Sequence, residues 1–288
     1  MGEIHILEIT KYRFNKVIFL TTLFFQNLLV KFFYKNNINS DLQNIINSNR
    51  SFLDSIDKFL SYNDYKLNDY GLQKRIYDQI DNKISGQPIY SDLIIFLINN
   101  ILLKKNMNYL EIGASVLKNF LQINNGIRNS NLIAYDINEI NPTFRDLEMF
   151  SKNNNNLKYF KGSVLSKKDT QKFKEEFPNK FDFIFSDAMH TPEGIRSEYE
   201  LIIKNHLANN FIIYYDDLDF LGLEEEFSKI KFDISESSNQ HIYSYTFFIH
   251  GWIGQYEKLH KNGIISNLNI EEFMNKEDLK IYKFKKMT

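Results

Sequence analysis

Five acidic residues lie at the ends of short apolar runs that are expected to be strands of a parallel sheet. They are Glu111, Asp136, Asp187, Asp216 and Asp217. The carboxyl ends of parallel strands share one edge of a sheet, so these carboxylates are expected to meet there. Because like charges repel, either some of them are separated or a cation lies among them. Oxygen ligands of this kind suit Mg²⁺ or Ca²⁺.

A histidine follows the third of these acids. His190 stands three residues after Asp187, in the sequence Ser-Asp-Ala-Met-His. An imidazole suits general-base work near neutral pH, so His190 and Asp187 are the candidate catalytic residues. The alternative is that His190 only caps the following helix or bonds to a neighbour. Asp216 and Asp217 would then form a strand-end turn without a metal.

A turn of small residues, Gly113-Ala114-Ser115, ends the apolar run 109–112, and a second apolar run, 132–135, ends on Asp136. A strand, a small-residue turn, a helix and an acid about 20 residues further on form the βαβ pattern of nucleotide binding. The turn lets a ligand approach the backbone, and the acid can accept hydrogen bonds from a ribose diol. The alternative is an ordinary βαβ unit with no ligand.

This stretch, with Glu111 two residues before Gly113, resembles the first motif of class I S-adenosylmethionine (SAM)-dependent methyltransferases, although it carries a single glycine. The resemblance implies a Rossmann-like, mainly parallel α/β sheet with an N-terminal helical cap, and SAM as the cofactor. Asp136 would bind the ribose, and Glu111 would lie near the ammonium of the methionine part or hold the turn. The implied cofactor contacts are Glu111, Gly113, Ala114, Ser115, Asp136, Ile137, Gly162, Ser163 and Asp187.

The acids after the fourth and fifth predicted strands resemble those of metal-dependent O-methyltransferases, including the macrocin O-methyltransferase and cephalosporin-hydroxylase-like groups. The resemblance covers Ser85 to Leu221, and it implies that Asp187, Asp216 and Asp217 hold Mg²⁺ or another divalent cation. It also implies methyl transfer to a hydroxyl of a small molecule or sugar. Two alternatives stay open: a non-catalytic binding or scaffold protein on the same fold, and a metal-dependent enzyme of another class.

Apolar periodicity and turn residues predict the elements that position these groups. Strands are expected at 109–112, 132–135, 157–160, 181–189, 211–215 and 242–250, with the last strand at either 264–268 or 281–284. Helices are expected at 51–60, 72–84, 91–103, 116–123, 142–150, 166–177, 191–207, 223–230 and 256–261. Ser51 and Thr191 are expected to cap their helices, with Pro192 at the first helical position. Asn36 to Asn49 is expected to be a loop or a weak helix.

The chain is expected to divide into an N-terminal helical extension or cap, 1–84, and a SAM-dependent methyltransferase domain, 85–288. Its most apolar run, Val17 to Val30, is too short for a transmembrane helix and too often broken by polar residues. The segment 17–33 is therefore expected to form a helix that packs on the domain or on a second subunit, as in a homodimer. A helix at the surface of a membrane, with cationic flanks, is the alternative.

Composition limits the classes of partner and site. A net charge of −1 gives no reason to expect nucleic acid, and the acceptor is expected to be a small molecule or a sugar. The chain has no cysteine, which excludes disulfides, zinc-thiolate sites and cysteine nucleophiles. This composition is compatible with a reducing compartment, and the expected location is the cytoplasm. His250 and His260 are expected to be structural or exposed.

Overall fold

The computed structural model describes residues 37–56, 87–104, 106–115, 117–140, 150–250 and 259–287, together with Thr21, Phe25 and Asp146. The chain divides into two units, Met1–Asn36 and Asn37–Thr288, and the fold below belongs to the second. Four predictions fall outside the described residues. They concern the segment 17–33, the helix 72–84, a boundary at residue 84 and most of the helix 142–150. None of the described helices combines the length and the hydropathy that a bilayer crossing requires.

The described strands form one sheet in the order β3-β2-β1-β4-β5-β7-β6-β8. Their bounds are β1 Asn108–Ile112, β2 Asn131–Asp136, β3 Asn156–Lys161, β4 Phe181–Ser186, β5 Leu207–Tyr215, β6 Tyr243–His250, β7 Leu259–Ser266 and β8 Tyr282–Lys286. The strands from β3 to β5 run parallel, whereas β7 is antiparallel to β5 and β6, and β8 is antiparallel to β6. The predicted Rossmann-like, mainly parallel α/β sheet is confirmed. Its strand order reverses between β1 and β4, where such sheets bind ligands.

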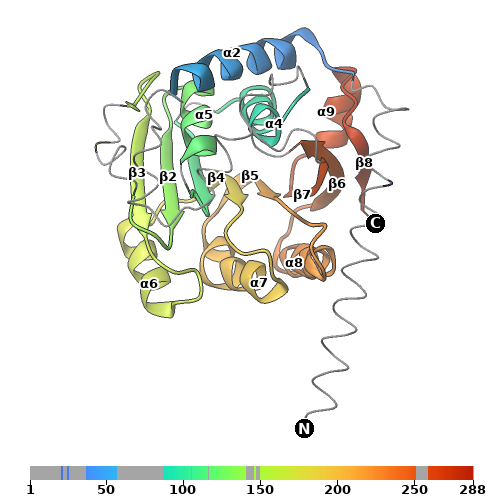
Figure 1. Cartoon of the computed structure of the whole chain (residues 1–288). Helices are drawn as coiled ribbons and strands as arrows, with labels where there is room; N and C mark the ends of the chain where they lie inside the picture. The colour runs from blue at the N-terminus through green and yellow to red at the C-terminus, as the bar shows by residue number, and fades with distance from the viewer. Residues whose placement is uncertain are drawn as a thin grey trace. The chain divides into compact units, whose positions relative to one another are not determined.

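Helices cover both faces of the sheet (Figure 1). Their bounds are α2 Ser40–Ile56, α4 Tyr90–Leu97, α5 Lys118–Gly126, α6 Lys167–Glu176, α7 Pro192–Leu201, α8 Leu223–Ser237 and α9 Ile270–Lys276. On one face lie α4, α5 and α9, with α2 packed over α4 and α5; on the other lie α6, α7 and α8. Each face has its own apolar core. Because β4 is covered on both sides, every one of its residues is buried, as its continuous apolar run predicts.

The helix after β4 begins as its sequence predicts. The Thr191 hydroxyl accepts a hydrogen bond from the Gly194 amide, and Pro192 takes the first helical position. However, α7 ends at Leu201, not at residue 207, because a short 3₁₀ turn follows it and β5 already begins at Leu207. The predicted strand 181–189 is also too long. It ends at Ser186, so that Asp187 to His190 form the loop into α7.

The segment from Asn36 to Asn49, expected to be a loop or a weak helix, is helical from Ser40 onward, and the start predicted for the following helix at Ser51 is wrong. The structure has one helix, α2, from Ser40 to Ile56, so Ser51 lies inside it and caps nothing. Its start is set by Asn39, whose side chain accepts a hydrogen bond from the Leu42 amide. Leu42 and Ile46 are fully buried against the neighbouring helices. This tertiary burial, one turn apart on the helix, outweighs the weak helix propensity of an asparagine-rich segment.

The C-terminal part differs from its prediction in three ways. Both candidates for the last strand are strands, since β7 contains residue 264 and β8 contains residue 282. A helix, α9, lies between them where none is predicted. The predicted helix 256–261 is wrong from Leu259 onward, because β7 begins there and pairs with β5 and β6 on its two sides. The β5–β7 pairing joins residues distant in sequence, so local periodicity does not reveal it, whereas β6 and β7 are consecutive strands of the chain.

Candidate active site

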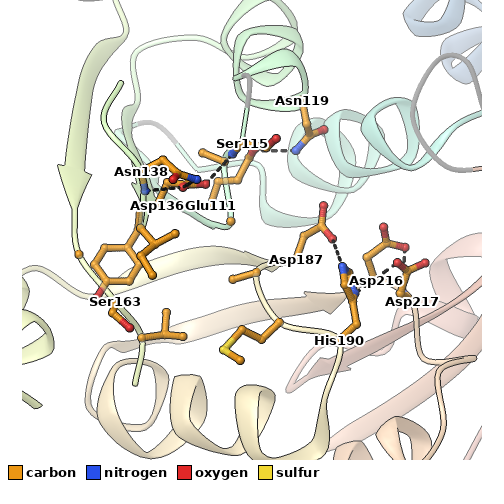
Figure 2. A pocket seen from close by; sticks show the side chains of 18 of the residues that line it. Glu111, Ser115, Asn119, Asp136, Asn138, Ser163, Asp187, His190, Asp216 and Asp217 are labelled. Atoms are coloured by element: carbon orange, nitrogen blue, oxygen red, sulfur yellow. Dashed lines mark hydrogen bonds and ion pairs between the residues drawn. The ribbon is translucent and has the colours of Figure 1, made fainter. Parts of the chain in front are cut away.

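A cavity of about 630 Å³ opens at the carboxyl edge of the parallel strands. Its volume lies in the range of small-molecule and cofactor sites. It is lined by every residue that the sequence predicts to bind a cofactor or a metal or to act in catalysis: Glu111, Gly113, Ala114, Ser115, Asp136, Ile137, Gly162, Ser163, Asp187, His190, Asp216 and Asp217. Figure 2 shows two groups among them, one around Glu111, Ser115 and Asp136, the other around Asp187, His190 and the acidic pair.

The turn after β1 is tightly constrained. Gly113 has φ +90°, and a Cβ atom there would lie 2.4 Å from the backbone oxygen of Asp187. Only glycine fits a left-handed conformation with so close a neighbour. The turn is also tied to β2, because the Gly113 amide donates to the Tyr135 carbonyl at 2.8 Å and the Ser115 amide to Asp136 Oδ2 at 2.7 Å. The backbone therefore passes close to the floor of the cavity, as the small residues predict.

Asp136 ends β2 and organises the next part of the cavity. Its Oδ1 accepts hydrogen bonds from the Asn138 amide at 2.9 Å and from the Asn138 side chain at 3.2 Å (Figure 2). Beside it the apolar side chains of Ile137 and Leu165 are 62% and 54% exposed, although both line the cavity. An acid and two exposed apolar side chains in one cavity offer hydrogen bonds and an apolar surface to one ligand.

Glu111 lies deeper, where it is buried against two donors. The Tyr109 hydroxyl and the Asn119 side chain each donate to Glu111 Oε2 at 2.7 Å. Burial raises the pKa of Glu111 to about 8, and these hydrogen bonds only partly oppose it. Lys118 and Asn119, which begin α5, are buried and line the same cavity, and Asn119 Oδ1 has no hydrogen-bond partner among the described residues. Neither residue is predicted from the sequence to line the site, although both follow the turn directly.

The second group of side chains surrounds His190. Its Nδ1 lies 3.3 Å from Asp217 Oδ2, and its Nε2 lies 3.9 Å from Asp187 Oδ1 (Figure 2). The imidazole stacks on the ring of Phe220, with centroids 5.1 Å apart and 23° between the planes. Asp187, His190 and Asp217 lie close together, as their positions at strand ends predict. The sequence could not predict that His190 would lie between the two acids.

Strand β7 supplies partners that the sequence reasoning did not place in the site. His260 Nδ1 contacts Asp217 Oδ1 at 2.5 Å, and the Asn262 side chain donates to Asp216 Oδ1. Asn262 is itself held by the Tyr214 hydroxyl at 2.7 Å. Residues 260 and 262 share one face of β7, so alternate positions of one strand hold the two consecutive acids. His260 lines the cavity, and the alternation would have revealed it had β7 been recognised as a strand.

The electrostatics of this group favour a bound cation. Burial, together with the charges of Asp216 and Asp217, raises the pKa of Asp187 well above its usual range. Burial and the Asp217 charge raise the pKa of Asp216 to about 7. Burial lowers the pKa of His260, but its hydrogen bond to Asp217 and the surrounding acids outweigh this and raise it to about 9. Protons on Asp187 and Asp216 relieve the repulsion among these carboxylates, and a bound cation would relieve it in the same way.

Ligand atoms for a cation converge here. One oxygen or nitrogen from each of Asp187, His190 and Asp217 lies within 4.8 Å of the others, and the same holds for Asp217, Asp219 and His260. Among the described residues neither group includes Asp216, which faces Asn262 instead. Asp219 Oδ1 and His260 Nε2 are buried without a hydrogen-bond partner in the part of the chain described. This donor set, rich in carboxylate oxygen, is compatible with Mg²⁺.

Below the loop that carries Asp187 lies a buried acid, Glu198 of α7. It is 0% exposed, and it accepts a hydrogen bond from the Ser186 hydroxyl. Burial raises its pKa to about 8, against the opposing effect of hydrogen bonds from Ser186 and the Met189 amide. The folded protein therefore keeps a proton on Glu198 that the unfolded chain loses above its ordinary pKa of 4.5.

Glu198→Gln should therefore flatten the dependence of stability on pH. A raised pKa contributes stability that is present below pH 4.5 and is lost as pH rises to about 8. Between these limits the free energy of unfolding of the wild type should fall by about 1.4 kcal/mol per pH unit because of Glu198, and that of the variant should lack this contribution. Chemical unfolding at a series of pH values measures the slope. Glu200→Gln, on the exposed side of the same helix, is the control, and equal slopes for both variants would refute the assignment.

A scan against protein-family models finds no match, and a search of curated proteins finds no matching sequence. Among solved structures, the chain is similar to the O-methyltransferase from Bacillus cereus in complex with S-adenosylhomocysteine (SAH), at 12% identity, 86% of this chain and 99% of that chain covered, and a TM-score of 0.46. It is also similar to the O-methyltransferase TomG from Streptomyces achromogenes in complex with SAM (11%, 83% and 93%, 0.46). A third is Aeropyrum pernix fibrillarin with natively bound SAM (11%, 65% and 86%, 0.41). Values this low assign no function.

Proposed function

We propose that this chain is a SAM-dependent methyltransferase. The observation that supports this proposal most is that three sets of side chains, each suited to a different chemical group, line one cavity. Asp136, with the apolar side chains beside it, suits a nucleoside. Glu111, Lys118 and Asn119 offer an acid, a cation and an open amide oxygen to an amino-acid head group. The acids around His190 suit an acceptor and its proton. A ligand with a nucleoside at one end and a zwitterion at the other matches the first two.

The reaction that we propose is transfer of the SAM methyl group to a hydroxyl of a small molecule or a sugar. The acceptor oxygen forms a bond to the methyl carbon while the carbon–sulfur bond breaks. The electron pair of the carbon–sulfur bond goes to sulfur, which becomes the neutral thioether of SAH. The hydroxyl proton passes to His190, and alignment of oxygen, carbon and sulfur supplies most of the acceleration.

We further propose that a divalent cation assists this reaction, with Mg²⁺ as the first choice. Asp187 and Asp217, whose oxygens converge, would hold it together with Asp216, once Asp216 turns from Asn262 toward the ion. When bound, such an ion lowers the pKa of an acceptor hydroxyl and so favours the nucleophile. His190 lies between Asp187 and Asp217, so it is placed to accept the proton released there. Three further points stay predictions. They are that the protein is located in the cytoplasm, that it has no nucleic-acid partner, and that segment 17–33 contacts a second subunit or a membrane.

Ligand selectivity tests the proposed cofactor. In calorimetric titrations, SAH should bind at least about tenfold more tightly than adenosine, since its amino-acid part adds hydrogen bonds at Glu111, Lys118 and Asn119. NAD⁺, which lacks the amino-acid part, should bind no more tightly than adenosine. Equal affinity for SAH and adenosine would refute the amino-acid subsite, and preference for NAD⁺ would refute the methyltransferase proposal.

A further inference from the structure

One carboxylate in the cavity, Asp217, lies between two imidazoles. Its Oδ2 faces His190 Nδ1 at 3.3 Å, and its Oδ1 faces His260 Nδ1 at 2.5 Å. His190 comes from the loop before α7, Asp217 from the loop after β5, and His260 from β7. Each carboxylate oxygen thus has one imidazole partner, and the three side chains form a continuous chain from β7 to the candidate base.

Asp217 depends on β7 for its position. It has φ +54°, a left-handed conformation that a non-glycine residue adopts only when its surroundings hold it. Its amide donates to Asp216 Oδ1 at 2.8 Å, and the next amide, that of Leu218, donates to the Lys261 carbonyl at 2.7 Å. The side-chain contact with His260 therefore lies beside a backbone contact with the same strand.

The geometry also determines what each nitrogen of His190 can do. A neutral imidazole carries one N–H, and a carboxylate beside one nitrogen places the hydrogen there. Asp217 Oδ2 lies 3.3 Å from Nδ1, closer than Asp187 Oδ1, which lies 3.9 Å from Nε2. The hydrogen is therefore placed on Nδ1 and the lone pair is left on Nε2, as a base requires. Stacking on Phe220 restricts the plane of the imidazole. Stacking alone does not decide which nitrogen faces Asp217, because a ring that turns over still stacks on Phe220.

We propose that His260 is a positioning residue for His190, acting through Asp217. The imidazole of His260 holds one oxygen of Asp217, so that the other fixes the Nδ1–H form of His190. The inference deepens the proposed function, because it assigns to β7 the orientation of the base. His260 itself need not contact either substrate.

The tautomer of His190 tests this inference, and the measurement needs neither SAM nor an acceptor. The chain has six histidines, so ¹⁵N-histidine NMR spectra are simple, and the signals lost in His190→Asn identify that residue. The wild type should show His190 as the Nδ1–H form. His260→Leu should shift it toward a mixture of tautomers, whereas His260→Asn should preserve it, since an asparagine amide can donate where Nδ1 does. His241→Leu, away from the cavity, is the control.

An unchanged Nδ1–H form in His260→Leu would overturn the inference. Activity gives a second readout once an acceptor is known: His260→Leu should lower kcat about 10- to 100-fold with KM for SAM unchanged, and His260→Asn should restore most of it. Full recovery of the leucine variant at saturating Mg²⁺ would also overturn it, because His260 would then act through a metal. SAH affinity, measured in each variant, separates these outcomes from a failure of the proposed cofactor.

Discussion

Asp136→Asn should lower the affinity for SAH by about 100-fold or more. Two hydroxyls of a ribose would donate to this carboxylate, and hydrogen bonds to a charged group contribute about 1.5–3 kcal/mol each, with 1.4 kcal/mol equal to a factor of ten. The amide keeps the size of the side chain but has a single acceptor oxygen. The Ser115 and Asn138 amides, which already point at Asp136, would compete for it. Isothermal titration of SAH measures the loss.

The control for this variant is Asp182→Asn. Asp182 is a buried aspartate at the start of β4, far from the cavity along the strand, and it likewise accepts a backbone hydrogen bond, from the Asn108 amide at 2.9 Å. It also pairs with Lys104 at 2.7 Å. Its replacement should lower thermal stability and leave SAH affinity unchanged. If Asp136→Asn binds SAH within threefold of the wild type, the ribose assignment is wrong.

Asp216→Asn combined with Asp217→Asn should abolish turnover while SAH still binds. The two acids lie with His190 in the second group of Figure 2, apart from Glu111 and Asp136. Removing both charges leaves His190 without its Asp217 partner and a cation without two of its predicted ligands. A loss of at least about 100-fold in kcat is expected from the proton-transfer step alone. Release of SAH from SAM in the presence of an acceptor measures it.

Two comparisons interpret this double variant. Asp233→Asn, on α8, removes a partly exposed charge that pairs with Arg196, and it should leave turnover unchanged. Excess chelator added to the wild type should reproduce the double variant if a divalent cation assists the reaction. Full turnover in chelator would remove the metal from the proposal but leave the role of His190. Full turnover in the double variant would contradict both.

The sequence predicts the assembly of the site because strand ends obey a simple geometrical rule. Gly113, Asp136, Asp187 and the acidic pair each follow an apolar run, and parallel strands bring such positions to one edge however far apart they lie in the chain. Gly113 illustrates why residue type also counts, since no other residue accommodates its φ and its closeness to Asp187. Both inferences use only local runs and turn residues.

The partners from β7 lie beyond that reasoning. His260 is 43 residues from Asp217, and β7 enters the sheet between β5 and β6, antiparallel to both. No local pattern reveals such an insertion, and Tyr256 to Lys261 even shows helical spacing. Likewise α2 forms because its buried face packs on α4 and α5, although its asparagines disfavour a helix. In both places tertiary contacts decide the structure, whereas the predicted site rests on local sequence.

The most direct test of the proposed function is a thermal-melt titration of the wild-type chain with SAH, with and without Mg²⁺. A ligand that binds only the folded state must raise the melting midpoint, by an amount that grows with its concentration. We expect a dose-dependent rise with SAH and a further rise when Mg²⁺ is added. No rise at SAH concentrations in the millimolar range would mean that the Gly113 turn and Asp136 do not hold this cofactor. It would contradict the assignment as a SAM-dependent methyltransferase.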